Sequence, residues 1–390
     1  MTSYDVIIIG GAITGTCTAF HLLQKSPKLR ICICEADTTY RRAATALSTG
    51  GVRVLFSQPE SILMSQYGHE FFGRFTECLR IADSSLDIAF RRQGYLFIAN
   101  TAEQAQDLRL NRELQVAMGC DVLLLDPDEL EELFAVYNTS DVVTAAYSPN
   151  DGWIDPMAAM QCLLIAVKER GAEIIHERVA SVDHNDGAVT GITTATGRLL
   201  SCGAVVNATG AWTAELSRPL GMKLPISPLP RMVYFFRTED PLPPLPLTLD
   251  GYGASFRPEG NGFICGVTEY GTVGEFKFEV DYSFFEEVVW PKLAHLVPAF
   301  ERIKLSSAWV GHYDLNTFDG NVILGPWIGG FENYYVTAGS SGHGLQHAPA
   351  IGRAIAELIV DGSFRTIDLS RFTYQRILDN APYPERGNKA

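Results

Sequence analysis

The feature that most constrains this chain lies near its start, where an apolar run passes directly into a glycine-rich turn. Residues 6–9 are all apolar, as in a buried parallel strand, and Gly10 and Gly15 follow them closely. Gly10 would let the backbone bend sharply, and Gly15 would let a helix over residues 14–24 pack closely on the strand. The helix N-terminus and its free N–H groups would then face the end of the strand, as in sites that bind a pyrophosphate.

An acidic residue completes this pattern. A second strand is predicted over residues 30–35, and its last residue, Glu35, lies twenty positions after Gly15. A carboxylate at that place can accept hydrogen bonds from ribose hydroxyls. Ala12 departs from the G-x-G-x-x-G spacing, because a methyl group replaces the second glycine. The segment predicts an adenine-dinucleotide site, with an ordinary βαβ crossover as the alternative.

Composition narrows the class of protein. The chain has 390 residues, 46% of them hydrophobic, which is enough for two domains. Asp and Glu outnumber Lys and Arg by 45 to 31, so we expect no nucleic-acid partner, because such surfaces need basic patches. An anionic cofactor would have to be held by backbone dipoles and local arginines. No apolar run reaches the roughly eighteen residues that a membrane span needs.

The eight cysteines are scattered through apolar segments, which predicts reduced thiols in the core rather than a disulfide framework. Cys32 and Cys34 are the one close pair, and on a strand they would share a face. The first predicted strand begins at residue 5, which leaves no room for a targeting segment. Together these features predict a cytoplasmic protein.

A second α/β block is expected from residue 151. Asp155 can cap a helix over residues 156–170 that has Pro156 at its first position and stops at Gly171. Further elements expected in this block are a strand over residues 173–177, a hairpin around 185–187 and an apolar strand that enters a glycine turn at 207–212.

Two other stretches differ in character, since aromatic and proline-rich strands prevail over the α/β pattern. Elements expected in them are strands at 95–99, 232–237 and 262–267, a charged helix at 103–118 and a short acidic helix after Pro127. The chain then returns to an α/β pattern, with a strand at 334–338 and a helix at 348–361 that ends at Gly362.

The most specific motif is the turn after that strand. Residues 337–352 read TAGSSGHGLQHAPAIG. With the N-terminal fingerprint, the 207–212 turn and the segment 309–326, this motif resembles the D-amino-acid-oxidase superfamily of FAD flavoproteins, which includes sarcosine oxidase, glycine oxidase and dimethylglycine dehydrogenase. The chain is most similar to the branch of FAD-dependent oxidoreductase domain-containing proteins.

The resemblance implies an α/β fold with a split FAD-binding domain of the Rossmann-like, glutathione-reductase type. This domain would comprise residues 1–85, 150–215 and 320–390. An inserted α+β substrate domain, built on a mostly antiparallel sheet, would comprise residues 86–149 and 216–319.

The resemblance also implies which residues hold FAD. The N-terminal turn would meet the pyrophosphate, Glu35 the ribose, Val179 the adenine, and the C-terminal turn the flavin pyrimidine. The expected FAD-binding residues are Gly10, Gly11, Ala12, Ile13, Thr14, Gly15, Glu35, Ala36, Arg42, Ala44, Thr45, Ser48, Val179, Ala208, Gly210, Trp212, Gly311, Ser341, Gly342, His343, Gly344, Leu345 and Gln346.

Departures from the relatives refine these expectations. The chain has neither a histidine in residues 46–51 nor a cysteine near Gly311, so FAD should be bound non-covalently. Gln346 stands where monomeric sarcosine oxidases have a substrate-binding lysine. Ile264 stands where the same oxidases have a lysine that assists oxygen, so either O2 or another electron acceptor remains open.

The candidate catalytic residues are Arg53, His312, Tyr313, His343 and Gln346, with Tyr252 and Arg257 expected in the substrate pocket. Arg53 is predicted to bind a carboxylate, the alternative being an ion pair that orders its loop. For His343 and His312 the alternatives to proton transfer and substrate contact are structural roles. Tyr313 could equally order its own loop.

The resemblance thus implies hydride transfer from the carbon beside a secondary or tertiary amine, or an N-alkyl amino acid, to flavin N5, which gives an imine. One alternative is a dehydrogenase that passes electrons to a quinone or a protein. Another is a flavoprotein that acts mainly as an assembly or interaction factor. A NAD-dependent dehydrogenase fits the C-terminal turn less well, and the sequence leaves the oligomeric state open.

Overall fold

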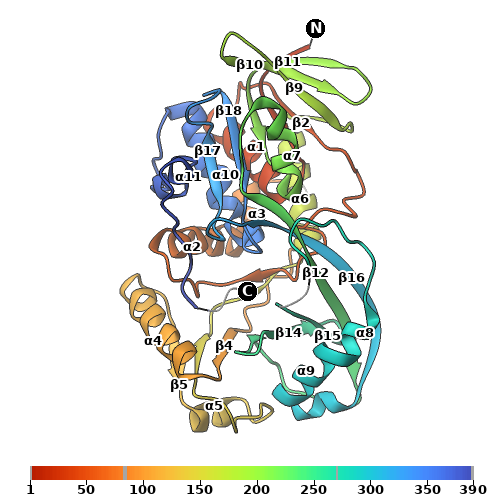
Figure 1. The fold of residues 1–390 in the computed structure, drawn as a ribbon, viewed down its shortest axis with the longest axis vertical. Helices are drawn as coiled ribbons and strands as arrows, with labels where there is room; N and C mark the ends of the chain where they lie inside the picture. The colour runs from red at the N-terminus through yellow and green to blue at the C-terminus, as the bar shows by residue number, and fades with distance from the viewer. Residues whose placement is uncertain (1, 82–85, 269–270, 388–390) are drawn as a thin grey trace.

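The computed structural model describes residues 2–81, 86–268 and 271–387, which form two large sheets with helices packed around them (Figure 1). The first sheet has the strand order β17-β18-β11-β1-β2-β8, and a hairpin of β9 and β10 extends β11. Its strands are β1 Thr2–Ile9, β2 Ile31–Cys34, β8 Glu173–Ile175, β9 Val179–Asn185, β10 Ala188–Thr194, β11 Leu199–Asn207, β17 Ile323–Pro326 and β18 Tyr334–Ala338. The path from β18 to β8 is parallel, which gives the sheet its α/β character.

The second sheet has the order β16-β12-β15-β14-β13-β4-β6-β5 and is antiparallel except between β13 and β4. Its strands are β4 Tyr95–Ala99, β5 Leu123–Leu125, β6 Thr144–Ser148, β12 Ile226–Thr238, β13 Leu247–Leu249, β14 Ala254–Glu259, β15 Gly262–Val267 and β16 Ile303–Asn316. Two short strands, β3 Gly51–Val52 and β7 Gly152–Trp153, form a separate antiparallel pair. In the sequence, each lies where the chain passes from one large sheet to the other.

Helices cover both sheets. Those of the upper half in Figure 1 are α1 Ile13–Lys25, α2 Pro59–Gly73, α3 Phe75–Leu79, α6 Pro156–Glu169, α7 Thr213–Ser217, α10 Gly344–Asp361 and α11 Gln375–Leu378. Those of the lower half are α4 Ala102–Ala117, α5 Pro127–Leu133, α8 Tyr282–Phe284 and α9 Trp290–Leu296. The long strands β12 and β16 connect the halves, because Ile226 packs in the core of the first sheet and Phe236 in that of the second.

Most predicted elements are present. The strands predicted at 95–99, 262–267 and 334–338 have those bounds, and the predicted hairpin around 185–187 joins β9 to β10. Asp155 caps α6, since its Oδ1 accepts hydrogen bonds from the N–H groups of Met157 and Ala158, both at 2.9 Å. The division into two domains at residues 85, 150, 215 and 320 stays a prediction.

The prediction for the last helix was wrong at its start. The helix α10 begins at Gly344 rather than at 348, so Pro349 lies inside it. A proline inside a helix removes one backbone hydrogen bond, so the sequence predicted that the helix would begin close to Pro349 and not several residues before it. Packing overrides this cost, because residues 345–352 are all buried and a Cβ at Gly352 would lie 2.6 Å from the backbone of Cys17 in α1.

All eight cysteines are free thiols, as predicted. The Sγ atoms of Cys32 and Cys34 lie 3.8 Å apart on one face of β2. The prediction of full burial holds for five of them but not for Cys78, Cys120 and Cys202, which are half-buried. No helix in the described part of the chain has the length and apolarity needed to cross a membrane.

Candidate active site

The turn after β1 has room only for glycine at two positions. Gly10 has a φ of +103°, and a Cβ there would lie 2.5 Å from the carbonyl oxygen of Ala208. A Cβ at Gly15 would overlap the carbonyl oxygen of Gly10. The following helix, α1, has Ala12 at its N-cap, no side-chain cap and no acidic residue in its first turn. Its first turn is therefore open to an anionic group, which the helix dipole would attract.

Glu35 lies at the end of β2 beside this turn. Its Oε2 accepts a hydrogen bond from the N–H of Gly11 at 2.8 Å, and its Oε1 accepts one from the N–H of Asp37 at 2.8 Å. These two bonds fix the orientation of the carboxylate, and each oxygen keeps a lone pair that a hydroxyl group could use. The neighbouring Ala36 is exposed at the same edge.

The remaining FAD-binding candidates come from several elements: Thr45 and Ser48 lie on the loop after β2, Val179 begins β9, and Gly311 lies within β16 of the second sheet. Thr45 is buried and its hydroxyl lies 3.4 Å from the N–H of Ile13, while Ser48 accepts a hydrogen bond from Gly50 at 3.0 Å. The other candidates in this set are Thr14 and Gly11 at the first turn, the exposed Arg42 and Ala44, the buried Val179 and Ala208, and Gly210 and Gly311.

An aromatic cluster joins three of the candidates. The indole of Trp212 stacks on Phe276 with ring centroids 4.8 Å apart, and the guanidinium of Arg42 lies 4.6 Å from the ring of Phe278. The ring of His312 contacts both phenylalanines, with centroids 5.3 and 4.6 Å away, and its Nε2 accepts a hydrogen bond from the N–H of Lys277 at 3.0 Å. Burial lowers the pKa of His312, so its ring is neutral near pH 7.

The C-terminal turn forms a second open helix N-terminus. Ser341 and Gly342 have positive φ values, and a Cβ at Gly342 would lie 2.7 Å from the ring of Tyr313. The helix α10 that follows has His343 at its N-cap, without a side-chain cap or an acidic residue in its first turn. Asp314 ties this turn to β16, because its Oδ2 accepts the N–H of Gly339 at 2.8 Å.

Arg53 is the centre of the polar contacts at this turn. Its N–H donates to Oε1 of Gln346 at 2.7 Å, and its Nη2 lies 3.3 Å from Nε2 of His343. The guanidinium also contacts the carbonyl oxygen of Leu55 and lies 4.0 Å from the ring centroid of Phe56. Burial, and next the charge of Arg53, hold the pKa of His343 well below its usual value, so Nε2 can accept the hydrogen bond from Arg53.

Two cavities meet at this cluster, and both are lined by Arg53, Arg231, Tyr313 and His343. The inner cavity, of about 110 Å³, is also lined by Ser48, Leu345, Gln346, Arg257 and Ile264. The outer cavity, of about 310 Å³, is also lined by Phe97, Asn111, Ser341 and Glu385. The arrangement brings together Arg53, Tyr313, His343 and Gln346, four of the five catalytic candidates.

Arg231 was missed by the sequence reasoning. Its guanidinium lies 5.3 Å from the ring of Tyr313, and burial lowers its pKa. The available signal was a charged residue next to the apolar run of a predicted strand, because charged residues are uncommon at partly buried strand positions.

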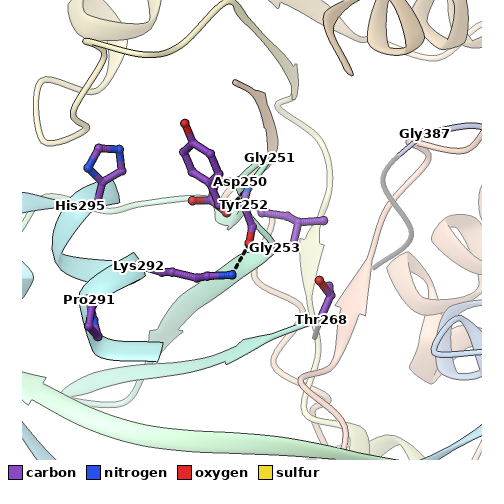
Figure 2. A pocket seen from close by; sticks show the side chains of 10 residues that line it. Asp250, Gly251, Tyr252, Gly253, Thr268, Pro291, Lys292, His295 and Gly387 are labelled. Carbon is purple, nitrogen blue, oxygen red and sulfur yellow. Dashed lines mark hydrogen bonds between the residues drawn. The ribbon is translucent and has the colours of Figure 1, made fainter. Parts of the chain in front are cut away.

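Of the other candidates, Arg257 reaches the inner cavity, while His312 and Tyr252 do not. His312 lines neither cavity. Arg257 lines the inner cavity, but its guanidinium contacts the carbonyl oxygen of Thr49 at 2.5 Å and the side chain of Glu259. Tyr252 lies in a third cavity, of about 620 Å³, beside His295 and Lys292 (Figure 2). Its hydroxyl donates to Asp141 at 2.8 Å. No group of histidines, cysteines and acids in the described residues has the arrangement of a metal site.

Two helix N-termini without capping side chains, an acid after β2 and a cavity beside α10 fit a protein that binds an anionic dinucleotide. The model of the FAD dependent oxidoreductase family matches residues 5–358, and the chain belongs to this family, whose cofactor is FAD. The glycine positions that a Cβ would obstruct and the absence of acids from both first turns fit this anionic group.

The chain is similar to FAD-dependent oxidoreductase domain-containing protein 1 of Xenopus laevis, with 37% identity over 98% of this chain and 84% of the relative. L-proline dehydrogenase of P. horikoshii has a similar structure, with a TM-score of 0.88 and 25% identity over 98% of this chain and all of that chain. Glycine oxidase of Geobacillus kaustophilus matches 96% of this chain and 98% of its own, with a TM-score of 0.84 and 24% identity.

Proposed function

We propose that this protein oxidises the C–N bond of a secondary or tertiary amine, in particular of an N-alkyl amino acid, to an imine. The observation that carries the proposal is the cluster of Arg53, His343 and Gln346 on the inner cavity, directly at the N-terminus of α10. FAD, when bound, supplies the acceptor of the hydride that leaves the carbon beside the nitrogen. The amino-acid substrate class is consistent with the similarity to a proline dehydrogenase and a glycine oxidase.

Arg53 would bind the substrate carboxylate. It is 4% exposed, and none of the described residues supplies a carboxylate within ion-pair distance. A buried guanidinium without an anionic partner is costly, and a substrate carboxylate would offset this cost. The contacts with Leu55 and the ring of Phe56 fix its direction before the substrate arrives.

His343 would keep the site suited to a neutral amine. Hydride loss from the carbon requires the free nitrogen lone pair, so the reacting amine has to be unprotonated. A neutral imidazole adds no positive charge of its own, and its Nε2 helps to hold Arg53. In this proposal His343 is a positioning residue, and the main chemical demand on the chain is orientation of the substrate.

We infer that FAD is held non-covalently by the residues named above, within a domain formed by residues 1–85, 150–215 and 320–390. The inserted segments 86–149 and 216–319 would then carry the substrate side of the cavity. The support for this division is that the parallel strands come from the first set of segments and the second sheet from the other.

Anaerobic bleaching of the flavin absorbance tests the proposal. The holoenzyme would be mixed with a panel of N-methyl amino acids, cyclic amino acids and simple secondary amines. We expect rapid bleaching by at least one N-alkyl amino acid and formation of the matching carbonyl compound after the imine hydrolyses. No bleaching across the panel would contradict the proposal and favour the alternative role as an interaction factor.

A dehydrogenase is the second candidate function. Ile264, an aliphatic residue, lines the inner cavity at the position where oxidase relatives are expected to have a lysine. The rates at which O2 and an acceptor dye restore the absorbance of the bleached flavin separate the two forms. Restoration that is rapid with the dye and slow with O2 would support the dehydrogenase.

A further inference from the structure

The outer cavity has a wall made by the C-terminal tail, the segment after α11. The tail passes the start of α2 and approaches α4 (Figure 1). Its residues Glu385 and Arg386 line the same cavity as Arg53 and His343. Sequence reasoning assigned no role to residues of this tail. Its contact with the same cavity as the catalytic candidates gives it access to a bound substrate.

Ser57 fixes the tail at this place. Its N–H and its hydroxyl donate to Oε2 of Glu385 at 2.7 and 2.6 Å, and its hydroxyl accepts the N–H of Arg386 at 2.6 Å. The carboxylate of Glu385 is therefore held by one oxygen, while its second oxygen is not used by Ser57.

Two residues that line this cavity each have a buried acceptor atom without a hydrogen-bond partner among the described residues. These atoms are Oε1 of Glu385 and Oδ1 of Asn111. The side chain of Asn111 belongs to a residue that is 8% exposed, and its Nδ2 donates to the carbonyl oxygen of Arg386 at 3.3 Å. Buried polar atoms are normally paired, because an unpaired one costs about 1–3 kcal/mol.

Both unpaired atoms are acceptors, so the complementary group is a donor, and the charge of Glu385 favours a cation. Arg53 and Arg231 line the same cavity, and their guanidinium groups suit an anionic group. A ligand that matches both sets of residues has a carboxylate at one end and an ammonium or guanidinium group at the other.

We propose that the outer cavity binds the cationic side chain of a basic amino acid, with Glu385 and Asn111 as the residues that determine this specificity. The inference rests on the proposed function, because the carboxylate of the same substrate would bind Arg53 and its C–N bond would lie in the inner cavity. Four residues line both cavities, so one substrate could occupy both at the same time.

A matched pair of ligands tests this inference. Nα-methyl-lysine and Nα-methyl-norleucine differ in the terminal ammonium group alone. We would measure the dissociation constant of each enantiomer for the holoenzyme by anaerobic calorimetry, together with the rate of flavin bleaching. The lysine compound should bind about tenfold more tightly or better, since charged hydrogen bonds contribute more than neutral ones.

Three variants make the result specific. Glu385→Gln should remove the preference for the lysine compound and leave the affinity for the norleucine compound within about twofold. Ser57→Ala removes the hydroxyl that holds Glu385 but keeps the carboxylate, so it should weaken the preference for the lysine compound less than Glu385→Gln does. Glu131→Gln, at an exposed position of α5, changes the net charge equally and should leave the preference intact.

Equal affinity of the wild-type protein for both compounds, or an equal loss with both in Glu385→Gln, would overturn the inference. Bleaching by the norleucine compound without any preference for lysine would leave the proposed oxidation standing. Binding of the lysine compound that depends on Glu385 but gives no bleaching would instead support the cavity and contradict the oxidation.

Discussion

At the scale of single residues, the site depends on how buried polar groups are paired. Arg53, His343 and Gln346 were all expected from the sequence, but their mutual contacts were not. Residues 53 and 346 lie far apart in the chain, and no spacing rule connects them. Arg231 and Glu385 were not predicted for the same reason, because a single charged residue forms no sequence motif that would indicate its place in a cavity.

Replacement of Arg53 tests its role in carboxylate binding. In Arg53→Met we expect kcat/KM for an N-methyl amino acid to fall about 100-fold or more, because a buried charged pair with the substrate is lost. For a secondary amine without a carboxylate, the same variant should lower kcat/KM much less. Steady-state rates with both compounds check this, and an equal loss for both would show that Arg53 supports the fold rather than the substrate.

Buried histidines predict how stability depends on pH. Burial lowers the pKa of His347 to about 3 and that of His21 to about 4, both below the value near 6.5 of an unfolded chain. The unfolded state therefore binds more protons below pH 6.5, and stability falls as the pH falls. Each of these histidines should lower the free energy of unfolding by about 2 kcal/mol when the pH falls from 7 to 5.

Denaturant unfolding at several pH values measures this dependence. In His347→Gln the slope of the unfolding free energy against pH between 5.5 and 4.5 should decrease by about 1.4 kcal/mol per pH unit, the value for one proton. The hydrogen bond between Ser65 and Nε2 of His347, at 2.9 Å, makes glutamine a suitable replacement. An unchanged slope would contradict the lowered pKa.

At the scale of elements, the strand and helix ends hold the candidate cofactor residues. The N-terminal unit was predicted well, because its strand, turn and helix depend on residues within one short segment. The start of α10 was not, since the burial of residues 345–352 against α1 and α2 outweighs the effect of Pro349. Packing against distant helices cannot be seen in a local pattern.

The glycines of the first turn give a prediction at this scale. Gly15→Ala places a methyl group against the carbonyl oxygen of Gly10, so α1 would have to move away from β1. We expect the purified variant to contain less than about a tenth of the wild-type FAD, as measured by the ratio of flavin to protein absorbance. Ala12→Gly restores the missing glycine of the motif and should retain full FAD content.

At the scale of the whole molecule, bound FAD should link the first sheet to the cavity beside the second. Binding to the folded state alone stabilises a protein by an amount that grows with the ligand concentration. We therefore expect the thermal midpoint of the apoprotein to rise when FAD is added. Thermal unfolding at several FAD concentrations checks this, and a midpoint that stays constant would contradict binding to the folded chain.

The mode of FAD attachment is a separate prediction for the whole molecule. Acid precipitation of the holoenzyme should release all flavin into the supernatant, because no cysteine follows Cys265 and residues 46–51 contain no histidine. Absorbance of the supernatant and the pellet provides the measurement. Flavin that stays in the pellet would show a covalent bond and overturn the prediction.

The sequence by itself determined the dinucleotide-binding unit, the order of most strands and helices, and the resemblance to FAD oxidoreductases. These depend on local spacing, on apolar periodicity and on contiguous motifs such as residues 337–352. Only the tertiary structure decided which charged residues share a cavity, that Tyr252 lies apart from Arg53, and that Glu385 of the tail faces the candidate site. The physical reason is that a cavity is made by side chains from segments distant in sequence, and their meeting depends on the packing of the whole chain.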